Sequence, residues 1–269
     1  MLKTRILTAV ILGVLLLAVL FALPAALTRV VFGLVFVGAA WEWAGFGGLR
    51  ALPARTVYAL GSGVLLALAW SYSASAAHLL LLLRAACLWW VAAFLWVTMA
   101  PRRQWPGLTL LCGIAVLVPA FVALARVQAG RGTMSGSLAV LWLLLLVFAA
   151  DIGAYFAGRR FGRLKLAPQV SPSKTWEGLI GGLLAVALIA GCGGLAFHVS
   201  VAVAIGFGCA LGLVSVVGDL TESMFKRAAG LKDSSALLPG HGGILDRIDS
   251  ISAAAPLYAL GLFGSGLFK

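Results

Sequence analysis

The sequence predicts an all-α, polytopic integral membrane protein with about nine transmembrane helices and two polar loops. Of the 269 residues, 62% are hydrophobic and only 10% are charged, and the mean hydropathy is +1.09. Several apolar runs are long enough to cross a bilayer. The acids are crowded instead of scattered, because five of the eight carboxylates lie between Gly218 and Ser250. Little of the chain is left for a separate soluble domain.

Nine apolar stretches account for most of the chain. They cover residues 6–23, 30–49, 56–72, 76–99, 108–125, 137–156, 176–197, 201–220 and 250–268. The first resembles a signal peptide, but further spans follow it, so we interpret it as a retained helix. We divide this single membrane domain into N-terminal helices, 1–135, and a C-terminal catalytic region, 136–269.

The basic residues predict the orientation of these spans. With a cytoplasmic N-terminus and strict alternation, fifteen of the twenty Lys and Arg residues fall in cytoplasmic segments and four on the other side, with Arg84 inside a span. Cytoplasmic loops of membrane proteins carry such an excess. The net charge of +12 suits an anionic lipid surface and anionic substrates. Nucleic acid is not an expected partner, because no basic domain interleaved with aromatic residues is present.

In the N-terminal half of the chain, two charged residues lie inside predicted spans. Glu42 stands between two tryptophans in the second span, and Arg84 lies in the fourth. Burying a charge at that depth in a membrane costs free energy, so such a residue usually has an interaction partner or a functional role. An internal brace and a substrate role are equally open for them. The four cysteines all lie in apolar segments and form no CxxC pair, so we expect them to pack as apolar side chains.

In the polar segment between Gly218 and Ser250, the carboxylates are spaced as they would be in a metal site. If the preceding apolar helix continues, Asp219, Glu222 and Lys226 share one face, at i, i+3 and i+7. Asp246 and Asp249, at i and i+3, would share a face where the next helix starts. Carboxylates suit Mg²⁺, a hard cation that prefers a few of them together with substrate phosphates. The predicted metal ligands are Asp219, Asp246 and Asp249.

Glycines separate these two sets of acids. The stretch 239–243 reads Pro-Gly-His-Gly-Gly, and such a backbone can approach a ligand closely and offer N–H groups to a phosphate. The alternative is a solvated loop whose acids and bases pair with each other. The glycines and the membrane-boundary position favour a binding site.

The second polar loop, residues 158–175, gathers five basic residues. Arg159 and Arg160 fit an ordinary cytoplasmic loop. Ser171, Lys174 and Thr175 directly precede an apolar helix, and a helix N-terminus favours anions. We therefore expect phosphate contacts from these three residues.

A resemblance to a known family becomes specific at Ser223. From there to Asp249 the chain reads S-x-F-K-R-x4-K-D-x-S-x2-L-P-x-H-G-G-I-x-D-R-I-D, which resembles the CDP-diacylglycerol synthase (phosphatidate cytidylyltransferase) family over 27 residues. Ser171 to Thr175 is similar to its Ser-Pro-x-Lys-Thr motif. Asp151 resembles a further motif, although Ile152 occupies a place where a small hydroxyl residue is expected. The resemblance covers mainly the last 120 residues.

The resemblance implies a multi-span membrane enzyme that uses CTP, phosphatidic acid and Mg²⁺ to make CDP-diacylglycerol and pyrophosphate. It implies a bacterial cytoplasmic (inner) membrane, with membrane lipids around the protein and the active site facing the cytoplasm. A second cation and a homodimer are left open.

We assign roles by charge, because two polyanions must meet in this reaction. The segment 218–250 has five acids and four bases, and bound metal would reverse its net charge of −1. No strong base is needed, because the attacking phosphate is already ionised. The predicted catalytic residues are Asp219, Lys226, Asp246 and Asp249. The predicted substrate-binding residues are Ser171, Lys174, Thr175, Arg227, Lys232, Asp233, His241, Gly242, Gly243 and Arg247.

Two other functions compete with this one. A kinase or cytidylyltransferase acting on a polyprenol or another lipid phosphate would use the same charges. A transporter would fit the basic loops and the intramembrane Glu42 and Arg84, but it leaves the 27-residue pattern unexplained. A CDP-alcohol phosphatidyltransferase is excluded by the lack of its D-G-x2-A-R pattern.

Overall fold

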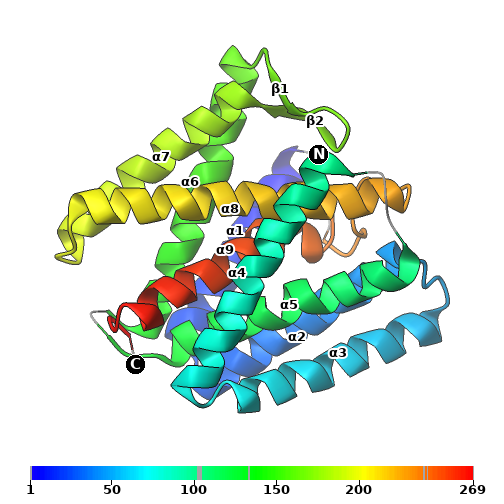
Figure 1. The fold of residues 1–269 in the computed structure, drawn as a ribbon, viewed down its shortest axis with the longest axis horizontal. Coiled ribbons are helices and arrows are strands. Elements are labelled where there is room, and N and C mark those ends of the chain that lie inside the picture. Colours follow the sequence, from blue (N-terminus) through cyan, green and yellow to red (C-terminus); the bar gives the residue numbers. More distant parts are fainter. Residues whose placement is uncertain (1, 102–104, 133, 239, 241, 269) are drawn as a thin grey trace.

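The computed structural model describes residues 2–101, 105–132, 134–238, 240 and 242–268, and the side chains from residue 7 onward. Within these residues it contains nine helices and one short hairpin (Figure 1). The elements are α1 (Leu2–Phe21), α2 (Ala25–Phe46), α3 (Leu52–Tyr72), α4 (Ala76–Met99), α5 (Pro106–Ala129), α6 (Gly136–Phe161), β1 (Lys165–Ala167), β2 (Ser171–Thr175), α7 (Trp176–Ala196), α8 (Val201–Ala228) and α9 (Leu245–Gly264). The predicted all-α class is confirmed, and the hairpin is an addition that the sequence did not predict.

Seven of these helices, α2 to α8, are long and apolar enough to cross a membrane. The two others that the sequence predicted as spans fall short by the same measure. The part of α1 whose side chains the structure describes, Leu7–Phe21, is apolar but shorter than the other helices. The first turns of α9 carry Asp246, Arg247 and Asp249, which lower its hydropathy. The rest of α9 is largely buried among other helices, so protein rather than lipid surrounds it.

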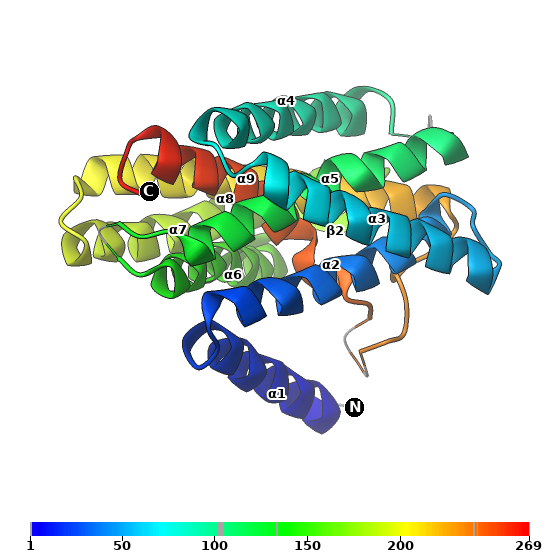
Figure 2. The ribbon, with the colours of Figure 1, turned by 90° about the horizontal axis from the view of Figure 1, so that it is seen from below.

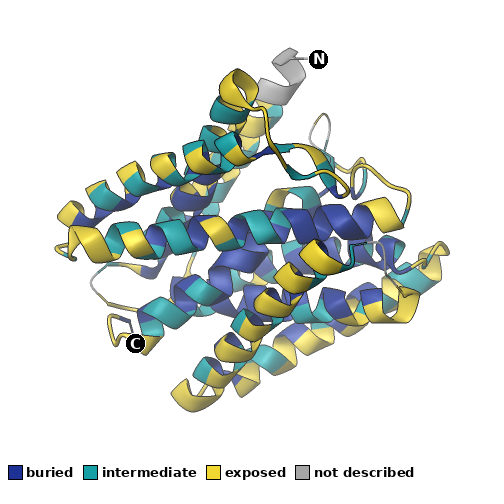
Figure 3. Cartoon of the chain, turned by 45° about the horizontal axis from the view of Figure 1, so that its top comes forward, coloured by how far each residue is buried: buried dark blue, intermediate teal, exposed yellow. Residues whose placement is uncertain are grey.

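The centre of the bundle is formed by α5 and α9. In the apolar window of α5, 72% of the residues are buried, compared with 17% for α3. Packed against α5 are α2, α3, α6 and α9, and packed against α9 are α4, α5 and α8. Figure 3 shows the exposed residues on the outer faces of the peripheral helices and the buried ones between them. The outer faces are apolar, as a lipid environment requires.

Small residues bring α6 and α7 together. A Cβ added to Gly181 would lie 2.2 Å from the Cβ of Ala157, and one added to Gly153 would lie 2.7 Å from that of Ala185. In a membrane, helices associate through close packing, because lipid chains are as apolar as the side chains. These glycines let the backbones of α6 and α7 lie close together. The close packing holds α7 and the hairpin before it in place.

The polar segments meet at one end of the bundle. Helix α8 continues to Ala228, beyond the predicted end at residue 220, and α9 begins at Leu245 instead of residue 250. The expectation that both sets of acids lie on helices is therefore confirmed. In Figure 2 the chain between α8 and α9 lies at the same end as the α2–α3 turn and the N-terminus, and the C-terminus lies at the opposite end.

Candidate active site

A close contact between α8 and α9 forms the floor of the site. A Cβ on Gly218 would lie 2.5 Å from the carbonyl oxygen of Asp249 and 2.7 Å from the Cβ of Ala253. Only glycine fits there without a shift of the backbone. Because Asp219 follows Gly218 directly, this approach brings the carboxylates of Asp219 and Asp249 close enough for their charges to interact.

Four elements contribute charged groups around this contact. The ammonium of Lys174, from β2, lies 2.7 Å from Oδ2 of Asp219. Asp151, from α6, is within electrostatic range of Asp219, Lys174 and Arg247. We call Asp151, Lys174, Asp219, Arg247 and Asp249 the outer cluster. It combines three carboxylates with two cations at one end of the helices.

The hairpin positions Lys174. Strands β1 and β2 pair antiparallel, and two hydrogen bonds attach them to the start of α7. The hydroxyl of Thr175 accepts the N–H of Gly178 at 3.1 Å and caps α7, while the N–H of Leu164 donates to Glu177 at 3.1 Å. Ser and Thr are common N-caps because they satisfy a free helix donor. The side chain of Thr175 thus serves the helix, and Lys174 beside it reaches the outer cluster.

A second, more buried group of polar residues lies between α8 and α9. The ammonium of Lys226 lies 2.6 Å from Oδ1 of Asp246 and 3.1 Å from Oε1 of Glu222. The other oxygen of Asp246 accepts the N–H of Gly243 and both the N–H and the hydroxyl of Ser234, at 2.8–2.9 Å. Although burial raises the pKa of Asp246, the bonds from Lys226 and Gly243 outweigh it and hold the pKa below its usual range. Glu222, Lys226, Ser234, Gly243 and Asp246 form the inner cluster.

Glu42 joins α2 to the inner cluster and is only 1% exposed. One of its oxygens accepts the hydroxyl of Ser235 at 2.6 Å and the N–H of Ile244 at 3.0 Å. The other accepts the hydroxyl of Ser234 at 2.9 Å and the N–H of Leu245 at 2.8 Å. Free N–H groups at a helix start need such an acceptor, and here a different helix supplies it. Of the two roles open for Glu42, the structure shows the hydrogen-bonded brace.

The glycine stretch packs against these acids. A Cβ on Gly243 would lie 2.0 Å from the hydroxyl of Ser234 and 2.5 Å from either oxygen of Glu42. Gly240 and Gly242 have φ of 75° and 77°, which glycine adopts without strain. The N–H of Gly243 donates to Asp246, so in this structure that amide serves the protein's own carboxylate. His241, predicted to bind substrate, lies outside the described residues.

The remaining predicted substrate-binding residues lie around the two clusters. Arg227 is exposed, and its guanidinium donates to the carbonyl of Leu231 at 3.2 Å. Lys232 and Asp233 are exposed on the following turn. Ser171 pairs with β1 at the far end of the hairpin from Thr175. Their roles toward a substrate stay predictions.

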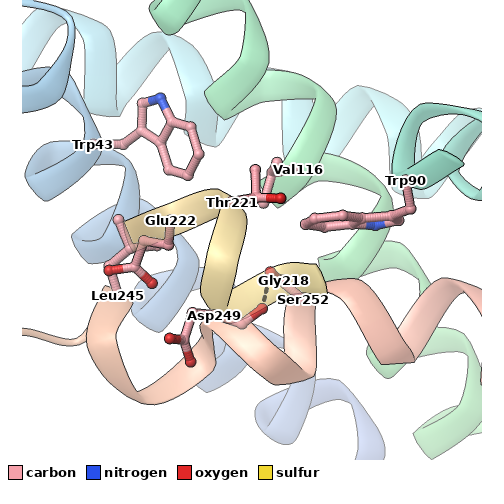
Figure 4. Close-up of a pocket in the computed structure, with 9 residues that line it drawn as sticks. All are labelled: Trp43, Trp90, Val116, Gly218, Thr221, Glu222, Leu245, Asp249 and Ser252. Carbon is pink, nitrogen blue, oxygen red and sulfur yellow. Dashed lines mark hydrogen bonds between the residues drawn. The ribbon is translucent and has the colours of Figure 1, made fainter. Parts of the chain in front are cut away.

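The acids of the two clusters differ in how far they are free to bind a divalent cation. Among the described residues, no three His, Cys, Asp or Glu side chains converge closely enough to hold an ion unaided. Both oxygens of Asp246 are engaged by protein donors. Glu222 is 2% exposed, and its Oε1 lies 3.1 Å from the ammonium of Lys226, while its Oε2 has no hydrogen-bond partner in the described part of the chain. Glu222 and Asp249 are among the residues that line one narrow gap, together with Trp43 and Trp90 (Figure 4).

This arrangement fits a cation that takes part of its coordination from the substrate. The charge of Asp249 is repelled by those of Asp219 and Glu222, and a bound cation would offset this repulsion. Mg²⁺ usually takes one or two carboxylates and completes its shell with water and phosphate oxygens. Asp219, Asp249 and Glu222 are the acids left for that task, because Asp246 anchors the glycine stretch. The metal set of Asp219, Asp246 and Asp249 stays a prediction, and the structure adds Asp151 as a neighbour.

Sequence reasoning left Asp151 without a role and did not include Ser234 in the site. The sequence signal for Asp151 was its position near the end of an apolar span, because a carboxylate inside a membrane span usually has a functional role. Ser234 had no sequence signal, because its importance comes from Glu42 and Asp246, which are distant in the sequence.

The chain is similar to known proteins over most of its length. The model of the cytidylyltransferase family matches residues 3–263. The chain belongs to the cytidylyltransferase family. A phosphatidate cytidylyltransferase of Pseudomonas aeruginosa is 42% identical over 99% of this chain and 98% of its own length. A phosphatidate cytidylyltransferase of Haemophilus influenzae is 39% identical over 96% of this chain and 98% of its own length. One of Brucella suis is 50% identical over 48% of this chain and 48% of its own length. The hairpin and both clusters lie within the matched residues 3–263.

Proposed function

We propose that this protein is a phosphatidate cytidylyltransferase, which transfers CMP from CTP to phosphatidic acid and releases pyrophosphate. Two relatives with that name match the chain at about 40% identity over nearly its whole length. The observation that carries the proposal within the molecule is the outer cluster. It presents carboxylates and cations together, where the apolar helices end, as a reaction between a soluble nucleotide and a lipid phosphate requires.

In the proposed reaction, a phosphate oxygen of phosphatidic acid attacks the α-phosphorus of CTP. A new P–O bond forms, the bond from the α-phosphorus to the β-phosphate oxygen breaks, and pyrophosphate leaves with that electron pair. The negative charges of the two substrates are the main barrier. Lys174 and Arg247 in the outer cluster supply cationic donors to phosphate, and Arg227 and Lys232 extend the positive surface toward the solvent.

Mg²⁺ is the proposed cofactor, and Asp219, Asp249 and Glu222 are the residues that would hold it or a second cation. When bound, it neutralises the leaving phosphates. Lys174, now paired with Asp219 at 2.7 Å, would turn to a substrate phosphate as substrate arrives. Asp246 and Lys226 hold the glycine stretch and the start of α9 in the geometry that the outer cluster needs.

The polar end of the bundle faces the cytoplasm in this proposal. In the predicted alternation of spans, fifteen basic residues fall in the segments assigned to the cytoplasm, and CTP is a cytoplasmic nucleotide. The enzyme would thus lie in the cytoplasmic membrane of a bacterium and draw phosphatidic acid from the leaflet that faces its outer cluster.

Purified protein with labelled CTP, phosphatidic acid and Mg²⁺ tests the function. The expected products are CDP-diacylglycerol and pyrophosphate in equal amounts, and none should form without the metal. Polyprenol and polyprenyl phosphate, supplied in place of phosphatidic acid, test the rival lipid substrates. Faster turnover of either would replace this proposal. No turnover of CTP with any lipid would leave a transporter as the better reading.

A further inference from the structure

An apolar groove of about 520 Å³ opens beside the outer cluster, between α4, α7, α8 and α9. Its walls include Cys87 and Phe94 from α4, Trp176 from α7, Val217 from α8 and Leu257 from α9. None of the described residues that line it is charged. The hydroxyl of Thr98, at its rim, donates to the backbone of its own helix. The groove therefore offers a ligand contact with hydrocarbon and almost no polar partner.

The groove begins at the residues that carry the polar site. Val217 and Leu220 line it and stand two residues before and one residue after Asp219 on α8. Trp176 lines it and follows Lys174 by two residues. Lys174 and Asp219 form a 2.7 Å ion pair, so the end of the groove lined by Trp176, Val217 and Leu220 lies next to that pair. A ligand that fills the groove would have its polar end at the outer cluster.

The depth of the groove matches one leaflet of a membrane. Thr98 and Cys87 both line it, and the eleven residues between these positions on α4 correspond to about 16 Å at 1.5 Å per residue. Half of a hydrocarbon core is about 15 Å thick. The groove thus reaches from the polar end of the helices to about the middle of a bilayer, which is the space that a lipid acyl chain occupies.

We propose that the groove between α4, α7, α8 and α9 holds an acyl chain of the phosphatidic acid while its phosphate lies at Lys174 in the outer cluster. This inference rests on the proposed function and adds the lipid subsite to it. The lipid enters sideways past α4, which lies at the outer edge of the bundle (Figure 2), and it does not need to leave the membrane. CTP reaches the same cluster from the solvent.

The native thiols provide a first test. Cys87 lines the groove, whereas Cys192 is exposed elsewhere on α7. Labelling by an apolar maleimide in detergent, followed by mass spectrometry of both peptides, should be at least fivefold slower at Cys87 with dioleoyl phosphatidic acid and unchanged at Cys192. Dioleoyl phosphatidylcholine at the same mole fraction should protect little. Equal protection by both lipids, or none by phosphatidic acid, would overturn the proposal.

A bulky side chain in the groove provides a second test that also separates the two proposals. Val91→Trp fills the groove from α4, and Leu88→Trp is its control, because Leu88 is 71% exposed outside the groove. Val91→Trp should raise the KM for dioleoyl phosphatidic acid at least tenfold, leave the KM for CTP unchanged and spare turnover of dihexanoyl phosphatidic acid. Equal kinetics of the two variants would refute the lipid subsite in the groove and leave the proposed function standing. A wild-type protein that makes no CDP-diacylglycerol from either lipid would refute the function.

Discussion

The backbone N–H of Leu245 donates a 2.8 Å hydrogen bond to Glu42, 203 residues earlier in the chain. The same carboxylate receives the hydroxyls of Ser234 and Ser235. A single acid from α2 thus fixes the first residue of α9 and the chain that leads into it. Since Asp246 and Asp249 follow on the first turns of α9, their position depends on a helix from the other half of the protein.

Glu42→Gln should destabilise the protein and abolish most activity. The amide of Gln has one oxygen and one NH₂ group. The two hydrogen-bond donors that bind one of the carboxylate oxygens of Glu42 would therefore face the NH₂ group, which is itself a donor. Losing two hydrogen bonds to a charged group predicts a cost of about 3–6 kcal/mol, at about 1.5–3 kcal/mol each. Thermal unfolding in detergent measures the loss of stability.

Glu177→Gln is the matched control, because Glu177 also accepts a backbone N–H but lies at the surface. Its unfolding temperature should stay close to that of the wild type. A Glu42→Gln protein that is as stable and active as the control would show that the brace is dispensable.

The sequence predicted the elements of this fold well and their connections poorly. Apolar runs of transmembrane length located all nine helices, because the cost of burying polar backbone in lipid leaves few other structures. The spacing of Asp219, Glu222 and Lys226 correctly indicated a continuing helix. The hairpin escaped notice, since its strands are short and mostly polar and rely on the start of α7 for support.

The division of labour among the acids could not be predicted from spacing. Asp246 and Asp249 have the same residue type and lie on one helix face, yet Asp246 is held by Lys226, Ser234 and Gly243. Those contacts depend on how the glycine stretch folds back, and no local pattern encodes that. The pairing of Asp219 with Lys174 likewise joins segments whose relative position is set by the packing of α6, α7 and α8.

The proposed orientation predicts which loops an impermeant thiol reagent reaches. Ser234 is unsuitable as a probe because it is buried and holds Glu42 and Asp246, whereas Ala236 in the same loop is exposed. In a variant lacking Cys192, Ala236→Cys should be labelled only after intact cells are opened. Ala74→Cys, exposed between α3 and α4 at the other end, should be labelled in intact cells. The reverse pattern would invert the topology and remove the site from its CTP supply.

Lys174→Ala should weaken substrate binding more than it weakens folding. Its ammonium is partly exposed, so its pairing with Asp219 adds little stability, but it is the cation nearest the proposed phosphate position. Losing a charged hydrogen bond of about 1.5–3 kcal/mol predicts a roughly 10- to 150-fold loss of kcat/KM. Lys165→Ala, in the same hairpin but exposed, is the control and should cost much less. Equal kinetics for the two variants would exclude Lys174 from the site.

Asparagine substitutions should divide the acids into two groups, because Asn keeps the shape of Asp without its charge. Asp219→Asn and Asp249→Asn should leave the unfolding temperature nearly unchanged and reduce activity at least a hundredfold, since these acids border the proposed cation position. Asp246→Asn should lower the unfolding temperature, because it weakens a buried pair with Lys226 and the anchor of the glycine stretch.

Divalent binding decides what the first group does. Loss of Mg²⁺ binding, measured by calorimetry without substrates, should follow loss of activity for Asp219→Asn and Asp249→Asn. Asp233→Asn is the comparison, because Asp233 is exposed in the loop, and it should lose less of both properties. Normal activity and Mg²⁺ dependence in Asp219→Asn and Asp249→Asn would place the metal elsewhere. An Asp246→Asn protein that is stable but has lost Mg²⁺ binding would restore Asp246 as a ligand and require its bonds to Lys226 and Ser234 to break on metal binding.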